Sequence, residues 1–221
     1  MENLSKNQIG MIVGGIIIAV VALFGAWKLT SKPQTPSKVD IVLNEHDHIK
    51  GNPQSPITLV EYSDFQCPAC KAYQPLVNQI ADKYKDSVKI VYRHFPLESI
   101  HKNARGAAYA AEAAARQGKF WELHDELFKN QQDWENEGDP GKKFETYIKN
   151  IKGDVERYKK DLKELSIQDK VDRDYASGVQ FGVNQPPTFN INVKKIKIPK
   201  AGDIKAHLKK EVKAQATKQT T

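Results

Sequence analysis

The sequence predicts an α/β domain that is interrupted by a helical insertion and preceded by a single membrane-spanning helix. Three observations support this prediction. The N-terminus is an apolar segment of helical length, short β-prone runs lie at both ends of the remaining chain, and a long helical stretch separates those runs. Along the chain, the globular part is predicted as strand, helix, strand, several helices, two strands and a closing helix.

The N-terminal segment carries no charge from Asn7 to Trp27, and nearly every residue from 9 to 27 is apolar or glycine. About 20 such residues are needed for a helix to cross the hydrocarbon core of a bilayer. A cleaved signal peptide would have a shorter apolar region ending in small residues, whereas this segment ends in FGAWKLTSKP. We therefore predict an uncleaved membrane anchor over residues 1–29, followed by a Pro-, Ser- and Thr-rich linker over residues 30–38.

The globular part begins with a strand and a helix that flank the two cysteines. PITLVEYSD, residues 56–64, is short, apolar and β-prone, as expected of a buried strand. In the segment that follows, apolar residues recur at helical spacing; they are Leu76, Val77, Ile80 and Tyr84. Pro68 suits the first turn of that helix. Cys67 is thereby placed at the helix N-terminus, where unpaired N–H groups and the helix dipole stabilise a thiolate.

The remaining segments complete the predicted sheet around the insertion. SVKIVYRHFPL, residues 87–97, predicts a second strand. Residues 100–178 predict the insertion, which includes the alanine-rich HKNARGAAYAAEAAARQ and the amphipathic GKFWELHDELF. PTFNINV and KKIKI predict two adjacent strands, and AGDIKAHLKKEVKAQA predicts the closing helix. The sheet domain is therefore expected in two parts, residues 39–99 with the CPAC motif and residues 179–221.

The formal net charge of +7 arises from the C-terminal end of the chain. Residues 1–189 contain 25 Lys/Arg and 25 Asp/Glu, whereas residues 190–221 hold nine Lys against Asp203 and Glu211. The basic segment has no aromatic residue that could stack on bases, so we predict no nucleic-acid partner. It is typical of a solvated helix face, or of attraction to anionic lipid headgroups if the domain lies near a membrane.

Cys67 and Cys70 are the only cysteines and form a C-x-x-C motif. A structural zinc site normally needs four ligands, and the spacing of His46 and His48 is poor for supplying the other two, so we predict no metal site. A cysteine hydrolase would use Cys67 as nucleophile with a histidine base, but it leaves Cys70 without a role. The candidate bases are His94, His101 and His124. A C-x-x-C between a strand and a helix is instead the expected setting of a redox-active dithiol.

Four segments are individually modest but specific in combination: EYSDFQCPAC, YRHFPL, GKFWELHDELF and GVNQPPTFNIN. Together they resemble the DsbA-like branch of the thioredoxin superfamily, especially its membrane-anchored bacterial thiol:disulfide oxidoreductases of the BdbD type. The resemblance covers roughly residues 56–212. It implies a thioredoxin fold with an inserted helical domain, an exposed attacking thiol at Cys67 and a buried resolving thiol at Cys70. It also implies no cofactor other than the redox-active disulfide between these two cysteines.

The same resemblance assigns roles to residues around the dithiol. Pro187 falls at the family's cis-proline position, which lies next to the dithiol in space. Glu61 falls at the position of a buried acid that moves protons to and from Cys70; the alternative is a side chain that faces solvent. The residues that would contact a bound substrate are Pro68, Ala69, Pro186 and Thr188.

Two residues depart from the family pattern. Ala69 stands where the most oxidising relatives have a histidine, and it cannot donate a charge or a side-chain hydrogen bond to the Cys67 thiolate. We therefore expect a somewhat weaker oxidant than those relatives. Pro186 stands where Thr or Val is common, and it has no N–H to pair with a substrate strand. We therefore expect looser and less sequence-selective capture of substrates.

The compartment and the reduction potential decide the direction in which such a dithiol works. Three lysines follow the anchor and favour a cytoplasmic domain, but long domains translocate largely regardless of flanking charge. The resemblance instead predicts a catalytic domain on the extracytoplasmic face of the plasma membrane. There it would oxidise reduced exported proteins and be reoxidised by a quinone-linked membrane partner. The alternatives are a thiol-disulfide reductase or isomerase, and a non-catalytic, chaperone-like binding module.

Overall fold

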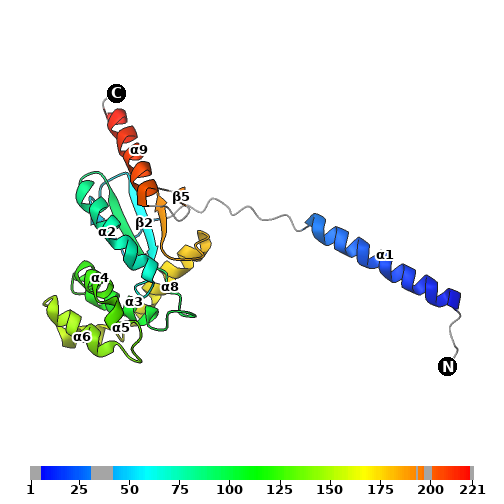
Figure 1. The fold of residues 1–221 in the computed structure, drawn as a ribbon, viewed down its shortest axis with the longest axis horizontal. Helices are drawn as coiled ribbons and strands as arrows, with labels where there is room; N and C mark the ends of the chain where they lie inside the picture. The colour runs from blue at the N-terminus through cyan, green and yellow to red at the C-terminus, as the bar shows by residue number, and fades with distance from the viewer. Residues whose placement is uncertain (1–5, 31–41, 193, 197–200, 220–221) are drawn as a thin grey trace. The chain divides into compact units, whose positions relative to one another are not determined.

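The computed structural model of the protein describes residues 6–30, 42–192, 194–196 and 201–219. The chain divides into two compact units, Met1–Lys38 and Val39–Thr221. In the first unit, α1 (Lys6–Thr30) is one helix of 25 residues (Figure 1). Over the described ranges, no helix meets the length and apolar character that crossing a membrane requires.

The second unit is built on one mixed sheet, in which the described strands follow the order β1–β3–β2–β4–β5. These strands are β1 (His48–Gly51), β2 (Thr58–Ser63), β3 (Lys89–His94), β4 (Thr188–Ile191) and β5 (Lys194–Ile196). Strands β2 and β3 are parallel, and the other three pairings are antiparallel. The four strands predicted from the sequence are confirmed.

Strand β1 is the one that the sequence analysis missed. Its four residues, HIKG, include a single β-branched side chain and no alternating pattern, so nothing local marks them as a strand. They form an edge strand because they pair with β3, with His48 opposite Tyr92. Gly51 ends the strand at φ +90°, where a Cβ atom would lie 2.5 Å from the Val88 carbonyl oxygen.

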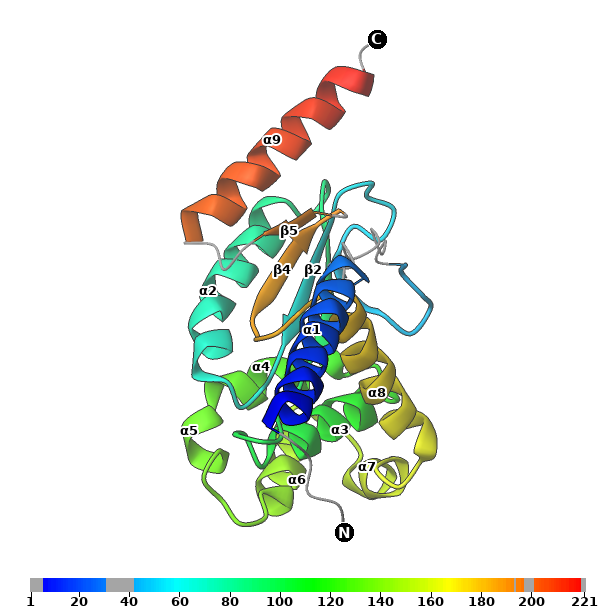
Figure 2. The ribbon, with the colours of Figure 1, turned by 90° about the vertical axis from the view of Figure 1, so that its right-hand side faces the viewer.

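Two helices flank the sheet outside the insertion, α2 (Pro68–Lys83) and α9 (Ala201–Gln219). The insertion between β3 and β4 contains α3 (Ala104–Ala115), α4 (Phe120–Lys129), α5 (Gln131–Trp134), α6 (Gly141–Asn150), α7 (Val155–Asp161) and α8 (Leu165–Gln180). Figure 1 shows α3, α4, α5 and α6 grouped at the end of the sheet opposite to α9. In Figure 2, α2 and α8 lie on opposite sides of β2 and β4.

Alternation along the strands explains why helices cover both faces of the sheet. Leu59 and Ile90 pack with α2 and α9 in one buried cluster. Val60 and Tyr62 point to the opposite face and belong to a second cluster with Phe95, against which Tyr175 of α8 packs. Both faces are therefore buried, as is usual for a sheet that contains parallel strands.

A third cluster fills the insertion and extends to both cysteines. Its centre is α3, in which seven of the alanines are at most 2% exposed; they are Ala104, Ala107, Ala108, Ala110, Ala111, Ala113 and Ala114. Small side chains let α4, α6, α7 and α8 approach this helix closely. The alanine-rich segment is thus the buried axis of the insertion, and nine residues separate the start of α3 from the end of β3.

Candidate active site

The two cysteines lie at the point where β2 ends and α2 begins. Cys67 is the N-cap of α2, and Pro68 occupies the first turn of that helix. Both cysteines are free thiols, so the structure represents the dithiol form. The predicted order of strand, C-x-x-C and helix is confirmed. It places the Cys67 sulfur among the unpaired N–H groups of the helix N-terminus.

The two thiols differ in access to solvent. Cys70 is fully buried and Cys67 retains 7% of its surface. The backbone N–H of Asp64 donates to the Cys70 sulfur at 3.5 Å, and the Cys67 thiol donates to the Pro186 carbonyl oxygen at 3.7 Å. Cys67 is the more accessible thiol, as predicted, but describing it as exposed was wrong, because the segment that contains Pro186 and the side chains of the insertion cover most of it.

The electrostatic environment separates the two thiols further. Hydrogen bonding from the Cys70 thiol, and then from the backbone N–H groups of Cys70 and Ala69, lowers the pKa of Cys67 to about 6, although burial and the charge of Asp64 oppose the shift. Burial raises the pKa of Cys70 well above its usual value, and the neighbouring Cys67 adds to this effect. At neutral pH, Cys67 is therefore the thiolate and Cys70 the protonated thiol. Thiol–disulfide exchange requires such a pair, in which one sulfur is the reactive thiolate and the other is its protonated partner.

The peptide bond between Pro186 and Pro187 is cis, which confirms the predicted cis-proline geometry. The carbonyl oxygen of Pro186, which belongs to this peptide bond, faces the Cys67 sulfur. Thr188 begins β4 opposite Tyr62, and its hydroxyl donates to the Gln185 carbonyl oxygen at 2.7 Å. Pro186, Pro187 and Thr188 are buried, whereas Pro68 and Ala69 are exposed. The fold brings these residues around the dithiol, and their contact with substrate stays a prediction.

Glu61 is buried in the middle of β2 and is 1% exposed, so the alternative of a solvent-facing side chain is wrong. Gln74 of α2 donates to its carboxylate at 3.2 Å. Burial raises the pKa of Glu61 to about 7, against the lowering influence of Ser63, Gln74 and Lys50. A carboxyl group with this pKa takes up and releases protons close to neutral pH, as proton transfer to a buried thiol requires.

Amide side chains that were not predicted from the sequence join the insertion to the active-site loop. Gln131 of α5 donates to the carbonyl oxygens of Phe65 and Cys67 at 2.7 and 3.1 Å. In the reverse sense, the Gln66 side chain of the loop accepts a hydrogen bond from the backbone N–H of Asn103 at 2.7 Å. Neutral amides give no periodic or spacing signal. Only their position opposite the loop shows their role in fixing the backbone that precedes α2.

The three candidate bases of a cysteine hydrolase are engaged elsewhere. His94 contacts Glu112 at 2.7 Å, His101 contacts Asp64 at 2.6 Å, and His124 contacts Asp125 at 2.8 Å. Among the hydrogen bonds of the described residues, none joins these rings to the Cys67 sulfur. The geometry therefore favours dithiol chemistry over hydrolysis.

Replacement of Glu61 by glutamine is expected to stabilise the protein above pH 7. A free glutamate ionises near pH 4.5 but Glu61 only near 7, so the unfolded chain loses this proton first as the pH rises. The native state is therefore progressively disfavoured between these two pH values. The loss in free energy of unfolding reaches about 3 kcal/mol, at about 1.36 kcal/mol per pKa unit.

Denaturant unfolding from pH 4 to 8 measures this loss in wild type and in Glu61→Gln, with the surface substitution Glu122→Gln as control. Equal stability of wild type and Glu61→Gln at pH 8 would contradict the assignment.

Comparison with known proteins agrees with this fold and site. The family model described as thioredoxin (Thioredoxin_4) matches residues 43–210. The fold and the dithiol thus define a thiol-disulfide oxidoreductase of the thioredoxin superfamily. Within that class, the chain belongs to the Thioredoxin_4 family and is a DsbA-like member.

Solved structures and curated relatives give the extent of the similarity. Oxidised BdbD from Bacillus subtilis is 27% identical, with a TM-score of 0.67 over 76% of this chain and 93% of that one. The α-DsbA1 of Wolbachia pipientis, at 18% identity, shares the fold with a TM-score of 0.71 over 81% of this chain and 97% of that one. A curated Na(+)/H(+) antiporter NhaA 1 of Mycolicibacterium gilvum is 33% identical over an alignment of 197 residues that covers 85% of this chain. The chain spans 31% of the length of that relative.

Proposed function

We propose that the protein is a dithiol oxidase that introduces disulfide bonds into exported proteins. The observation that carries this proposal is the unequal environment of the two sulfurs. Hydrogen bonds at the start of α2 stabilise the Cys67 thiolate, which exists only in the reduced protein. Stabilising the reduced form makes the disulfide a better oxidant, because the protein gains more from accepting two electrons.

The reaction begins from the Cys67–Cys70 disulfide. A substrate thiolate attacks the Cys67 sulfur, a mixed disulfide forms, and Cys70 leaves with the electron pair. A second substrate thiolate then attacks the substrate sulfur of the mixed disulfide, and Cys67 leaves as a thiolate. The substrate has lost two electrons and gained a disulfide. The enzyme holds those electrons as a dithiol, and a quinone-linked membrane protein accepts them when it reoxidises the enzyme.

Glu61 supplies the proton that the leaving Cys70 needs. Cys70 is fully buried and its thiol has a raised pKa, so an unprotonated sulfur there is a poor leaving group. Glu61 is the neighbouring acid whose pKa, about 7, allows it to be protonated in a large fraction of molecules at neutral pH. Burial raises the pKa of Tyr92 well above its usual value, and the charges of Glu61 and Cys70 add to this effect, so both groups lie within electrostatic range of the same phenol.

The N-terminal segment is proposed to anchor this domain to the plasma membrane, with the catalytic unit on the extracytoplasmic face. The support comes from the uncharged residues between Asn7 and Trp27. Large apolar side chains of α1 are also exposed; among them are Met11, Ile16, Ile17, Ile18, Val20, Val21, Leu23 and Phe24. An anchor of this kind would keep the dithiol in the plane in which newly exported chains and a quinone-linked partner are found.

The reduction potential of the full chain tests the direction of the reaction. We expect a value clearly above about −270 mV, the potential typical of thioredoxin, when detergent-solubilised protein is equilibrated with glutathione buffers. Replacing Ala69 by histidine should raise the potential further, because an imidazole beside Cys67 stabilises the thiolate. A potential at or below −270 mV would make the protein a reductase. A dithiol that never exchanged with glutathione would favour the chaperone-like alternative.

A further inference from the structure

Three side chains that the redox chemistry does not use converge between the sheet and the insertion. His48 of β1 and His94 of β3 each place Nε2 at 2.7 Å from the same carboxylate oxygen, Oε1 of Glu112 on α3. All three potential ligand atoms lie within 4.8 Å of one another. The two histidines lie on neighbouring strands, where His48 is opposite Tyr92 and His94 follows two residues later on the same face.

The three side chains of this cluster stand on regular secondary structure. Two ligands come from paired strands and the third from the buried central helix of the insertion. The His48 ring also stacks on Phe120 with 3.5 Å between ring centroids, which fixes its orientation. Sites built on strands and helices hold their ligands more precisely than sites built on loops. The cluster is therefore preorganised to bind a ligand that contacts two imidazoles and one carboxylate at once.

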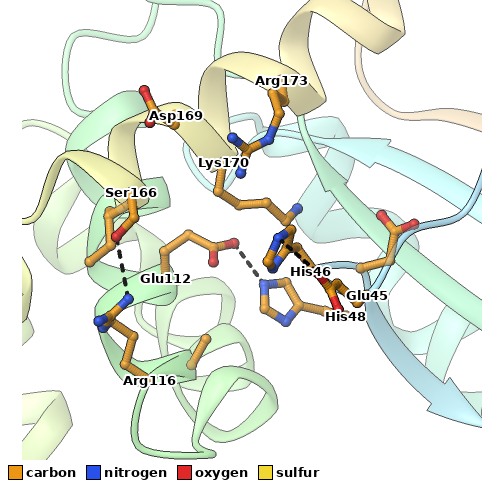
Figure 3. Close-up of a pocket in the computed structure, with 12 residues that line it drawn as sticks. Glu45, His46, His48, Glu112, Arg116, Ser166, Asp169, Lys170 and Arg173 are labelled. Atoms are coloured by element: carbon orange, nitrogen blue, oxygen red, sulfur yellow. Dashed lines mark hydrogen bonds and ion pairs between the residues drawn. The ribbon is translucent and has the colours of Figure 1, made fainter.

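The cluster opens on one side into a cavity of about 450 Å³ between α3, α8 and the segment before β1. Figure 3 shows the Glu112 carboxylate directed at His48, with Lys170 and Arg173 of α8 across the cavity. Glu112 is only 6% exposed and His94 only 1%, whereas His48 borders the cavity. A small ion can thus reach the cluster from solvent, and a water molecule can complete its coordination from the cavity side.

Two cations near the cluster already have carboxylate partners other than Glu112. Lys170 pairs with Asp174 at 2.5 Å, and Arg93 pairs with Asp47 at 2.9 Å. In the part of the chain that the structure describes, the Glu112 carboxylate makes its hydrogen bonds and ion pairs with the two imidazoles of the cluster. Imidazoles carry a full positive charge only when protonated. A buried carboxylate with only such partners is a site at which a cation is stabilising.

We propose that His48, His94 and Glu112 bind one late first-row divalent metal ion, with Zn²⁺ as the preferred occupant. Two imidazole nitrogens and one carboxylate oxygen form a donor set that suits Zn²⁺, whereas Ca²⁺ and Mg²⁺ prefer six or more oxygen ligands. With ligand distances of about 2.0–2.2 Å in a tetrahedral site, the two N–O separations need to open from 2.7 Å to about 3.4 Å. Each neutral imidazole keeps its proton on Nδ1 and coordinates through Nε2.

This site departs from the prediction that the protein has no metal site. In the sequence, His48 is a candidate ligand only together with His46 and the cysteines. The partners found in the structure are 46 and 64 positions further along the chain, as residues 94 and 112. The ion would join β1 and β3 to α3. It would therefore stabilise the docking of the insertion on the sheet rather than take part in electron transfer.

Zn²⁺ binding to the full chain tests the proposal. A reduced C-x-x-C dithiol also binds Zn²⁺, so the protein is used with Cys67 and Cys70 oxidised to the disulfide. We expect one tightly bound Zn²⁺ per chain, a rise in melting temperature with added Zn²⁺, and visible d–d bands with Co²⁺. Ca²⁺ and Mg²⁺ at the same concentration should have no such effect. Glu112→Gln, which retains a hydrogen-bond acceptor, should weaken Zn²⁺ binding at least about a hundredfold, because loss of even an outer-shell partner costs 10–100-fold.

His46→Ala is the matched control, since His46 borders the same cavity but lies outside the cluster. It should bind Zn²⁺ as the wild type does. His94→Ala serves as a second ligand variant, and if it fails to fold, Glu112→Gln alone decides. The proposal is overturned if Glu112→Gln and His46→Ala bind equally well, if the oxidised wild type binds no Zn²⁺ at micromolar concentration, or if only Ca²⁺ raises the melting temperature.

Discussion

Replacement of Cys67 by serine is expected to reduce the rate of thiol–disulfide exchange at least about a thousandfold. A serine hydroxyl is not ionised near neutral pH, and the chain has no other cysteine that could replace Cys67 as the nucleophile. Cys70 cannot take over. It has no exposed surface, and burial raises the pKa of its thiol. Cys67, by contrast, has a pKa of about 6 and is mostly thiolate at pH 7.

Cys70→Ser is the matched variant, because it removes the same atom from the other half of the motif. With Cys67 retained, it should still attack a peptide disulfide but should be unable to resolve the product. A stable mixed disulfide should therefore accumulate. Mass spectrometry of each variant after mixing with an oxidised peptide gives both rates in one experiment. Comparable rates for the two serine variants would contradict the assignment of Cys67 as the attacking thiol.

Part of this site could be predicted from short stretches of sequence. Cys67, Cys70 and Glu61 lie within ten residues of one another, on a strand and at the start of the helix that follows it. Their relative positions are therefore determined mainly by local secondary structure, which hydrophobic patterning reveals. The predicted burial of Glu61 and the N-terminal position of Cys67 on α2 are both confirmed.

The remainder depends on contacts between residues that are distant along the chain. The incomplete exposure of Cys67 is a consequence of Pro186, which lies 119 positions away, and no local pattern encodes that contact. The same reason applies to Gln131, which reaches the active-site loop across 64 positions. Strand β1 also exists only because β3 is available for pairing. Its absence from the predicted elements concealed both the histidine cluster and the ion pair that holds the chain before β1.

That ion pair is expected to be the most sensitive charged contact in the domain. Arg93 of β3 donates from Nε and Nη2 to the two carboxylate oxygens of Asp47, at 2.9 Å each. The side chains are 4% and 0% exposed. Arg93 also donates to the Val42 carbonyl oxygen at 2.7 Å. Asp47→Ala would leave a buried guanidinium with only neutral partners, and we expect the free energy of unfolding to fall by about 3–5 kcal/mol.

A matched surface substitution separates burial from charge as the cause. Asp172 also pairs with an arginine, Arg105, but its side chain is 58% exposed. Asp172→Ala should cost no more than about 1 kcal/mol, because solvent screens the charge that it leaves unpaired. Urea denaturation of the full chain and of both variants measures the difference. Equal effects of Asp47→Ala and Asp172→Ala on the free energy of unfolding would show that the burial of the Arg93–Asp47 pair does not increase the cost of breaking it.

The double variant Asp47→Ala/Arg93→Met determines how much of the fall in the free energy of unfolding is due to the unpaired charge of Arg93. Methionine fills much of the space of the arginine stem without bringing a charge into the interior. Removing both partners should therefore cost less than the sum of the two single substitutions, since the penalty for an unpaired buried charge is no longer incurred. A strictly additive result would mean that Asp47 acts through its other contact, in which it accepts a hydrogen bond from the Asn44 N–H at 2.9 Å. In that case the segment before β1 would be held by its own turn rather than by the sheet.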